Sequence, residues 1–280
     1  MKDFKNKVAA ITGAGSGIGR ALAMELGARG CHLALSDVNR ASLTETAQLV
    51  DESSAVKVTT QVVDVAKRQA VHTWAGKVAA EHGAVHLVFN NAGVALGSTI
   101  EGADYDDLEW IMNINFWGVV HGTKAFLPHL RAAGEGHIVN ISSVFGIIGV
   151  PSQGAYNATK FAVRGFTEAL RQELDMDGGG ISATSVHPGG IKTNIAQAAR
   201  FADNMDGVLG GKNEADGKAA FEKLFITTPE SAARTILKGV RRDSRRVLIG
   251  PDAHAIDAMA RLLPSHYQWL VGMGTKWAMR

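Results

Sequence analysis

A serine, a tyrosine and a lysine lie close together in the sequence and could jointly move a proton. Ser143 precedes Tyr156 by thirteen residues, and Lys160 follows Tyr156 by four. In a helix, residues four apart share a face, so the phenol and the ammonium can point into one space. A tyrosine titrates near pH ~10, and an ammonium beside it stabilises the phenolate and lowers that pKa. A serine hydroxyl there could hold a substrate oxygen, so the stretch predicts proton transfer without a metal.

A glycine-rich turn near the N-terminus could bind a hydride carrier to accompany that proton. The residues from Thr12 to Gly19 read TGAGSGIG and follow a strand-like apolar run. Glycines let the backbone approach a pyrophosphate closely, and the N-terminus of the next helix favours the anion. The residues expected to contact the cofactor in this turn are Gly13, Gly15, Ser16, Gly17, Ile18 and Gly19.

Asp37 ends the second predicted strand, eighteen residues after Gly19. A carboxylate at this place can accept hydrogen bonds from the adenosine ribose hydroxyls, and it repels a 2′-phosphate. The sequence therefore favours NAD over NADP. A capping or turn role is the alternative for Asp37, and the nearby Arg20 and Arg40 keep NADP open.

Apolar runs alternate with helical periods, and these elements must position the chemical groups. Strands are predicted at residues 8–11, 33–37, 56–63, 85–89, 138–141, 181–186 and 247–249. Helices are predicted at residues 18–26, 41–51, 67–82 and 155–175, and at 105–132 as one long helix or two broken near Pro128. Strands that alternate with helices indicate a parallel sheet covered on both faces. The predicted fold is α/β, a doubly wound Rossmann sheet of seven strands.

The bulk composition is that of a globular protein without a polyanionic partner. The 280 residues are 46% apolar and 20% charged, with 29 Lys+Arg against 27 Asp+Glu. We therefore expect no nucleic-acid partner, and we interpret the basic run Arg241, Arg242, Arg245 and Arg246 as a solvated loop. The single cysteine excludes an intrachain disulfide. Without a signal peptide or an apolar run of ~20 residues, we expect a cytoplasmic protein with no membrane span.

The organisation expected is one Rossmann domain over residues 1–280, because no Pro-, Gly- or Ser-rich linker divides the chain. Its cofactor half would cover about 1–135 and its catalytic half about 136–250. Residues 194–226 form a long stretch rich in Ala, Gly, Asn and Asp after a predicted strand. Such a stretch indicates a substrate lid, and Gly207, Gly210 and Gly211 could be its flexible points. The tail 251–280 is apolar and aromatic. Packing in the core or a subunit interface is the first interpretation of the tail, followed by a wall of the substrate pocket and by membrane contact.

The motifs resemble, in order and spacing, those of the short-chain dehydrogenase/reductase family, in its NAD-preferring branch of about 250 residues. The resemblance covers about 1–193 and, more loosely, 228–250. It rests on TGAGSGIG at 12–19, Asp64, NNAG at 90–93, NFWG at 115–118, the serines at 142–143, YNATK at 156–160, and Pro188-Gly189 with Thr193.

The resemblance implies a catalytic set of Asn115, Ser143, Tyr156 and Lys160. Tyr156 would exchange a proton with a substrate oxygen held by Ser143. Lys160 would lower the tyrosine pKa and hold the nicotinamide ribose, and Asn115 would support a water linking Lys160 to solvent. Besides Tyr156 and Lys160, the further cofactor contacts implied are Asp64, Val65, Asn91, Ala92, Gly93, Pro188, Gly189, Ile191 and Thr193. A homotetramer or homodimer is also implied, with subunit faces on the helices at 105–132 and 155–175.

The activity expected is the reversible oxidation of an alcohol to its ketone with NAD. Residues 94–99 (VALGST) and 144–150 (VFGIIGV) are apolar or small, which favours a hydrophobic secondary alcohol. The substrate contacts expected are Ser143, Phe145, Val150 and Tyr156. An NADP-dependent ketoreductase, an NAD-binding sensor or scaffold without turnover, and an isomerase or dehydratase remain alternatives. The histidines lack metal-site spacing, so no metal site is expected.

Overall fold

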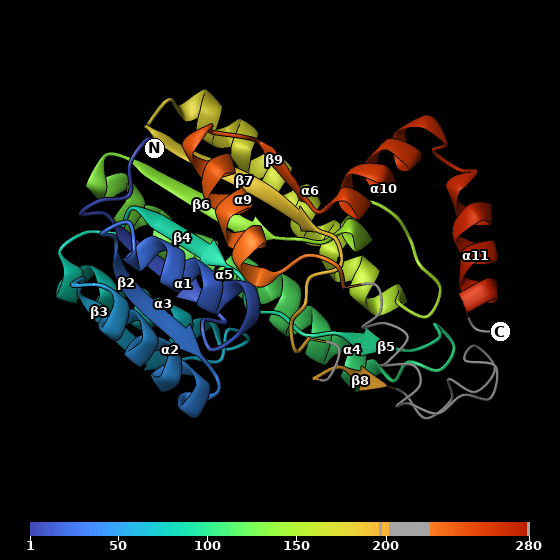
Figure 1. The fold of residues 1–280 in the computed structure, drawn as a ribbon, viewed down its shortest axis with the longest axis horizontal. Coiled ribbons are helices and arrows are strands. Elements are labelled where there is room, and N and C mark those ends of the chain that lie inside the picture. The colour runs from blue at the N-terminus through green and yellow to red at the C-terminus, as the bar shows by residue number, and fades with distance from the viewer. Residues whose placement is uncertain (196–197, 202–224, 279–280) are drawn as a thin grey trace.

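A parallel sheet with helices on both faces forms the body of the chain, as seen in the computed structural model (Figure 1). The structure describes residues 1–195, 198–201 and 225–278. The sheet has seven strands in the order β3-β2-β1-β4-β6-β7-β9, and every neighbouring pair is parallel. The strand bounds are β1 Val8–Thr12, β2 His32–Asp37, β3 Val58–Val62, β4 Leu87–Asn90, β6 Gly136–Ile141, β7 Ile181–Pro188 and β9 Arg246–Ile249.

Two apolar layers enclose this sheet. One layer is built with helices α1 (Gly17–Gly27), α2 (Arg40–Ser53) and α9 (Pro229–Arg241). The other is built with α3 (Arg68–His82), α5 (Gly118–Ala133) and α6 (Gly154–Asp177). Alternate strand residues point to opposite faces, so neighbours such as Ala10 and Ile11 enter different layers. The doubly wound α/β prediction is confirmed.

The helical region at 105–132 is interrupted, although not at the proline. Pro128 lies inside α5, which continues to Ala133. The irregular part is a π-helical turn, Asn113–Trp117, between α4 (Tyr105–Met112) and α5. Such turns are rare and are often found at functional sites. The prediction of a break near Pro128 was therefore wrong.

Most of the predicted lid lies outside the described residues, which omit 196–197 and 202–224 and with them Gly207, Gly210 and Gly211. The described part of the predicted lid is held by a strand pair and by contacts with α4. A second, two-stranded parallel sheet pairs β5 (Leu96–Gly97) with β8 (Arg200–Phe201). The Arg200 guanidinium carbon lies 3.7 Å from the ring centroid of Trp110, and Arg200 pairs with Asp107 at 2.9 Å. The lid therefore begins against α4.

The C-terminal tail forms two helices, α10 (Pro251–Leu262) and α11 (Tyr267–Ala278), which extend away from the sheet (Figure 1). Packing in the core or in a subunit interface was the first interpretation of this tail, and several of its apolar side chains are exposed. Leu262 is 80% exposed and Trp269 is 66% exposed. Packing of these side chains in the core is therefore wrong, and packing in a subunit interface stays a prediction. Among the described residues, no helix is long and apolar enough to cross a membrane.

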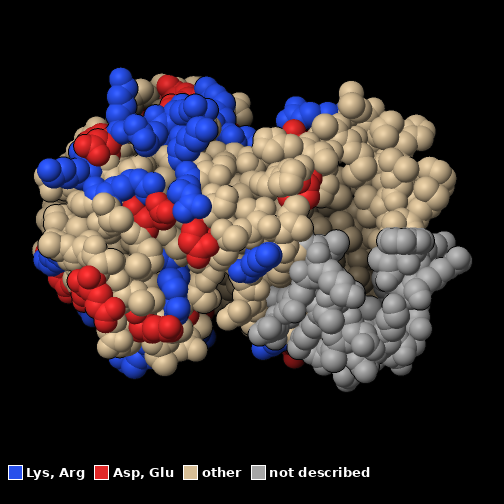
Figure 2. All heavy atoms as spheres, viewed as in Figure 1, with Lys and Arg blue, Asp and Glu red and all other residues tan. Residues whose placement is uncertain are grey.

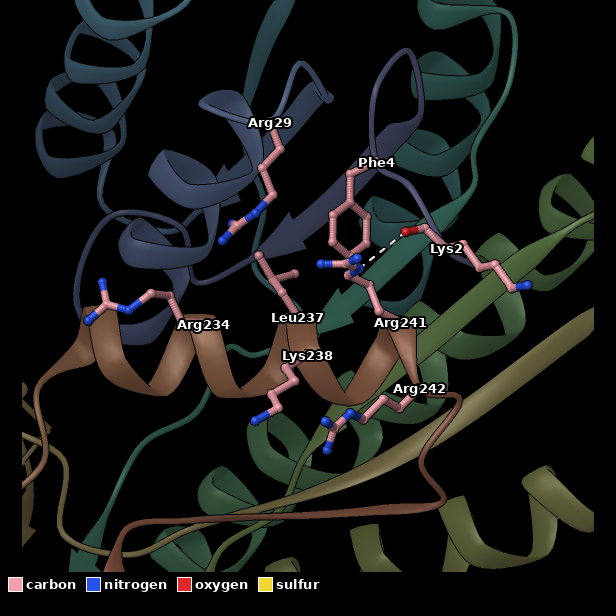
Figure 3. Close-up of a pocket in the computed structure, with 8 residues that line it drawn as sticks. All are labelled: Lys2, Phe4, Arg29, Arg234, Leu237, Lys238, Arg241 and Arg242. Atoms are coloured by element: carbon pink, nitrogen blue, oxygen red, sulfur yellow. Dashed lines mark hydrogen bonds between the residues drawn. The ribbon is translucent and has the colours of Figure 1, made fainter.

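Basic side chains gather around α9 (Figure 2) and line a groove of about 590 Å³ there. The groove lies at the opposite end of β1 from the glycine-rich turn, because Phe4 forms part of its wall. Its lining residues are Lys2, Phe4, Arg29, Arg234, Leu237, Lys238, Arg241 and Arg242 (Figure 3). Arg245 pairs instead with Asp175 at 2.6 Å, and Arg246 pairs with Asp257 at 3.0 Å. The run 241–246 leads from the end of α9 into β9, and Arg241, Arg242 and Arg245 are exposed, which agrees with the interpretation as a solvated loop before a strand.

Candidate active site

Ser143, Tyr156 and Lys160 are buried together where β6 ends. Ser143 is two residues beyond β6, and Tyr156 and Lys160 lie one turn apart in α6. Their exposed fractions are 9%, 9% and 4%. The Lys160 ammonium donates to the carbonyl of Ile141 at 3.0 Å, and its Nζ is 5.5 Å from the Tyr156 ring centroid. The sheet edge therefore sets the positions of all three groups.

Burial controls the titration of the tyrosine and the lysine. Burial raises the pKa of Tyr156 to about 12, and a hydrogen bond with Ser143 opposes part of this rise. Burial also lowers the pKa of Lys160 to about 8. The expected lowering of the tyrosine pKa by Lys160 is not among the causes of the shift, in which burial of the phenol is the largest. The phenol therefore keeps its proton at neutral pH and is ready to donate it.

Asn115 lies in the π-helical turn, and its side chain is fully buried. Its Oδ1 accepts from the Val94 amide at 2.8 Å, and its Nδ2 donates to the Val94 carbonyl at 2.9 Å. A Cβ on Gly93 would lie 3.2 Å from Asn115 Oδ1 and 3.5 Å from Lys160 Nζ. A glycine at 93 therefore leaves space between these two side chains. The structure brings Asn115 to the same place as the other three residues.

The glycine-rich turn has the geometry of an anion cradle. Gly13 and Gly17 have φ of +65° and +52°, and a Cβ on Gly13 would lie 2.8 Å from Ala92 Cα. Ser16 is the N-cap of α1, but its side chain makes no capping hydrogen bond, and the first turn has no acidic residue. The amide groups at this helix end can therefore face an anion. These residues fit the pyrophosphate of a dinucleotide.

Asp37 lies directly beside the glycine-rich turn. Its Oδ2 accepts from the Gly15 amide at 2.9 Å, and its Oδ1 accepts from the Asn39 amide at 2.9 Å. The N-cap of α2 is Asn39, so Asp37 does not cap that helix, whereas its hydrogen bond from the Asn39 amide is the turn role that was the other part of the alternative. Arg20 pairs with Glu45 at 2.6 Å and also donates to the Gly15 carbonyl. The guanidinium that kept NADP open is thus already engaged.

The remaining predicted cofactor residues surround the same turn. Asn91 donates through Nδ2 to the carbonyls of Thr12 and Gly13 at 2.9 and 3.1 Å, so this side chain holds the turn in place. Asp64 accepts from the Ala66 amide at 3.0 Å, and Val65 is buried in the layer of α3 and α5. Both follow β3, at the edge of the sheet where the turn lies.

Pro188 ends β7, and the loop that follows it, which contains Gly189 and Ile191, is held by later parts of the chain. The Gly189 amide donates to the Ile249 carbonyl at 2.9 Å. The Gly190 amide donates to Asp252, the second residue of α10, at 2.7 Å. Thr193 lies over the glycine-rich turn, since its Cγ2 is 2.9 Å from the Cβ that Gly17 would carry. The loop and the turn therefore face each other.

Two residues near the catalytic set were not singled out as site residues. The first is His187, in β7. Its Nδ1 lies 3.0 Å from the Ser143 carbonyl, and burial lowers its pKa to about 4, so a neutral ring donates to that carbonyl. The second residue, Asn157, donates to the carbonyls of Phe145 and Ile148, each at 2.8 Å, and accepts from the Val150 amide at 3.0 Å. In the sequence, only the position of Asn157 directly after Tyr156 indicated that its side chain could matter for the site. Both side chains position the segment after β6.

This constellation can be compared with known proteins. Residues 7–204 match the family model for short chain dehydrogenase. The chain belongs to the short-chain dehydrogenase family. This dehydrogenase is 49% identical over 274 residues to the Mycobacterium tuberculosis protein named "Putative oxidoreductase SadH". The matched region covers 98% of this chain and 97% of the relative. It is therefore an oxidoreductase of that family.

Solved structures of other short-chain dehydrogenases share the fold and contain nicotinamide cofactors. One from Burkholderia phymatum, in complex with NAD, superposes with a TM-score of 0.85 at 30% identity, covering 96% of this chain and 97% of that one. An alcohol dehydrogenase from Thermococcus sibiricus, complexed with 5-hydroxy-NADP, superposes with a TM-score of 0.71 at 27% identity, covering 87% and 95%. Neighbours of this dehydrogenase therefore bind NAD or NADP-type cofactors.

Proposed function

We propose that this short-chain dehydrogenase interconverts a hydrophobic secondary alcohol and its ketone with NAD as cofactor. The observation that carries the proposal is the buried group of Ser143, Tyr156 and Lys160 beside the glycine-rich turn. A dinucleotide on that turn would extend along the carboxyl edge of the sheet, where these three residues also lie. The group manages a proton, which is what hydride transfer at a carbinol carbon requires from the protein.

The roles we assign to the protein follow from the geometry. A bound nicotinamide supplies the hydride donor or acceptor. Ser143 donates a hydrogen bond to the substrate oxygen, and Tyr156 gives that oxygen a proton during reduction and removes one during oxidation. Lys160, fixed by the Ile141 carbonyl, stabilises the phenolate once it forms. Asn115 keeps the segment around Val94 in place beside Lys160.

The preference for NAD is supported by the charges around the glycine-rich turn. The Asp37 carboxylate touches the Gly15 amide and would repel a 2′-phosphate. Arg20 is occupied by Glu45. Arg40, three residues after Asp37, is exposed and could favour NADP. NADP is therefore the second candidate, and the NADP-type ligand of the Thermococcus neighbour is the reason to test it.

The apolar substrate is supported by the side chains around Tyr156. Tyr156 belongs to a buried apolar cluster with Ala95, Leu96, Ile111, Ala155 and Ala199. Phe145 packs edge-on against the Tyr156 ring at a centroid distance of 5.8 Å. Val150 is half-buried in the same segment as Phe145. Such walls favour a hydrocarbon skeleton over a sugar.

A homodimer or homotetramer is part of the proposal. Trp117 is 46% exposed at the end of the π-helical turn, directly before α5, and Phe161 is 40% exposed on α6. Large exposed apolar side chains on two long helices are typical of subunit interfaces. We assign the subunit faces to these two helices.

The test of this function is NADH formation by the purified protein. We expect the rise in absorbance at about 340 nm with NAD⁺ and a panel of hydrophobic secondary alcohols, such as cyclohexanol and 1-phenylethanol. The same panel with NADP⁺ serves as the cofactor control. If NAD binds and no alcohol in the panel yields NADH, the protein is a sensor or scaffold. If substrate is consumed without NADH, an isomerase or dehydratase is indicated.

The pH dependence should differ between the two directions. The pKa of Tyr156 is raised to about 12. At pH values below this pKa, the phenolate fraction grows about tenfold for each unit by which the pH rises. We expect kcat/KM for alcohol oxidation to rise steeply from pH 6 to about 8, where Lys160 begins to lose the charge that stabilises the phenolate, and kcat/KM for ketone reduction to stay flat over this range, since the phenol remains protonated. A deuterium isotope effect at the carbinol carbon establishes that hydride transfer limits the rate. A flat oxidation profile with that isotope effect would contradict the role of Tyr156.

A further inference from the structure

The first turn of α10 is bonded to the loop that follows β7. Asp252, the second residue of this helix, accepts through Oδ2 from the Gly190 amide at 2.7 Å. A hydrogen bond to a charged acceptor is about twice as strong as a neutral one. The other hydrogen bonds that later described residues make to this loop join backbone groups, such as the Gly189 amide and the Ile249 carbonyl. The Asp252 side chain therefore ties the loop to the start of the C-terminal tail.

The backbone next to the Asp252 carboxylate is glycine on both sides. A Cβ on Gly189 would lie 2.0 Å from Oδ2, and a Cβ on Gly250, whose φ is +96°, would lie 2.3 Å from Oδ1. A larger residue at either position would displace the carboxylate. Oδ1 is buried without a hydrogen-bond partner among the described residues. A buried oxygen without a partner is unfavourable for folding, which indicates a role for Asp252 other than stability.

The far end of the same loop lies over the glycine-rich turn. Thr193 Cγ2 is 2.9 Å from the Cβ that Gly17 would carry, so this side chain closely approaches the turn. Thr193 is only three residues after Gly190, the residue that Asp252 holds. A displacement of Gly190 would therefore move Thr193 relative to the turn. The carboxylate at the start of α10 thus controls one wall of the place where the pyrophosphate of a dinucleotide fits.

We propose that Asp252 is a positioning residue for the cofactor. Its carboxylate holds residues 189–193 over the glycine-rich turn before NAD binds, so the cofactor does not have to order this loop. The proposal rests on the proposed function, since it takes NAD as the ligand of the turn. The alternative is that Asp252 only stabilises α10, because a carboxylate in the first turn of a helix interacts favourably with the helix dipole.

The chain contains a matched control for that alternative. Glu230 is the second residue of α9 and follows Pro229, as Asp252 is the second residue of α10 and follows Pro251. Glu230 is exposed, whereas Asp252 is half-buried against the loop. Glu230→Ala therefore removes the same interaction with a helix dipole and leaves the bond to the Gly190 amide in place.

Titration calorimetry with the full-length protein tests the proposal without turnover. Asp252→Ala should weaken binding of NAD⁺ about tenfold, the effect of losing a hydrogen bond to a charged group. Binding of AMP should weaken less than about threefold, because AMP lacks the half of the dinucleotide beyond its phosphate. Asp252→Asn keeps an oxygen for the Gly190 amide and should bind NAD⁺ within about threefold of the wild type. Glu230→Ala should leave both affinities unchanged.

A double-mutant cycle tests the contact from the side of the loop. Gly189→Ala places a methyl group where Asp252 Oδ2 lies, so it should also weaken binding of NAD⁺ about tenfold. In the Asp252→Ala background the carboxylate is gone, and the same methyl group should weaken binding by less than about threefold more. Thermal unfolding shows which variants fold. If Asp252→Ala does not fold, Gly189→Ala and Asp252→Asn still test the proposal.

Kinetics distinguish positioning of the cofactor from a general loss of structure. In alcohol oxidation by Asp252→Ala, KM for NAD⁺ should rise about tenfold, whereas kcat at saturating NAD⁺ should change less than about threefold. The reason is that the substitution does not alter Ser143, Tyr156 or Lys160. A loss of kcat with an unchanged KM for NAD⁺ would contradict the proposal.

The outcomes separate this proposal from the proposed function. A folded Asp252→Ala protein that binds NAD⁺ within about twofold of the wild type would overturn the proposal, as would an equal loss in Glu230→Ala or in Asp252→Asn. Equal losses for AMP and NAD⁺, or additive effects in the double-mutant cycle, would also overturn it. NADH formation from alcohols would leave the function standing in each of these cases. Dependence of NAD⁺ affinity on Asp252 without NADH formation from any alcohol would support the proposal and remove the function.

Discussion

Tyr156→Phe is expected to lower kcat for alcohol oxidation by about 10³-fold or more, the effect of removing a general acid or base. The substitution deletes a single oxygen. The phenylalanine ring still packs against Phe145, whose centroid is 5.8 Å away, and the Lys160 bond to the Ile141 carbonyl does not involve the phenol. The affinity for NAD should change less than about threefold, because the glycine-rich turn is not altered. NADH formation gives kcat, and titration calorimetry gives the dissociation constant of NAD.

A matched tyrosine is available as control. Tyr105 is 84% exposed in the first turn of α4, so Tyr105→Phe should leave kcat, NAD affinity and stability unchanged. Because the Tyr156 hydroxyl is buried with Ser143, thermal unfolding of both variants should be measured to detect any loss of folded protein. A Tyr156→Phe protein that is folded, binds NAD and retains more than about a tenth of wild-type kcat would show that another group moves the proton.

Asp37→Ala is expected to weaken NAD binding by about 10- to 100-fold, the range for losing hydrogen bonds to a charged group. Binding of NADP should change less, or improve, since the carboxylate that repels a 2′-phosphate is gone. The ratio of the NAD and NADP dissociation constants, measured by titration calorimetry, is therefore the decisive quantity.

The carboxylate also holds the Gly15 amide, so loss of charge and loosening of the turn must be separated. Asp37→Asn keeps an oxygen acceptor for Gly15 and removes the charge. It should relieve the discrimination against NADP with a smaller loss of NAD affinity than Asp37→Ala. Asp51→Ala, an exposed carboxylate in α2, controls for net charge. An unchanged NAD-to-NADP ratio in both Asp37 variants would refute the assignment of Asp37 as the group that selects the cofactor.

Features determined by short-range sequence patterns were predictable. Strand and helix periods come from burial of one or both faces, so the order of strands along the chain could be read directly. The spacing of Tyr156 and Lys160 puts them on one helix face, and the glycine-rich turn lies between a strand and a helix in the sequence itself. The family resemblance then added Asn115, which no local pattern connects to Lys160.

Features that depend on distant parts of the chain were not predictable. The pKa of Tyr156 depends on how completely the surrounding elements exclude water, and spacing carries no information on this. Asn157 has an ordinary helix position in the sequence, and its three partners become apparent only when residues 145–150 fold over it. A break at Pro128 was considered because proline is the strongest local signal of a helix end. The structure instead has its irregular turn at Asn113–Trp117, and α5 continues through Pro128. The tail was assigned to the core or a subunit interface together, because apolar content alone does not specify what covers it.

The loop after β7 has a consequence for how the protein is made. Three backbone amides of this loop donate hydrogen bonds to later residues. The Gly189 amide donates to the Ile249 carbonyl, the Gly190 amide to the Asp252 carboxylate, and the Lys192 amide to the Thr227 carbonyl. All three partners are translated well after the loop itself. The glycine-rich turn emerges from the ribosome among the first residues, yet the loop that faces it gains its supports only after residue 252 has been added. During synthesis, which proceeds from the N-terminus, the cofactor cradle is thus begun at the start of the chain and completed close to its end.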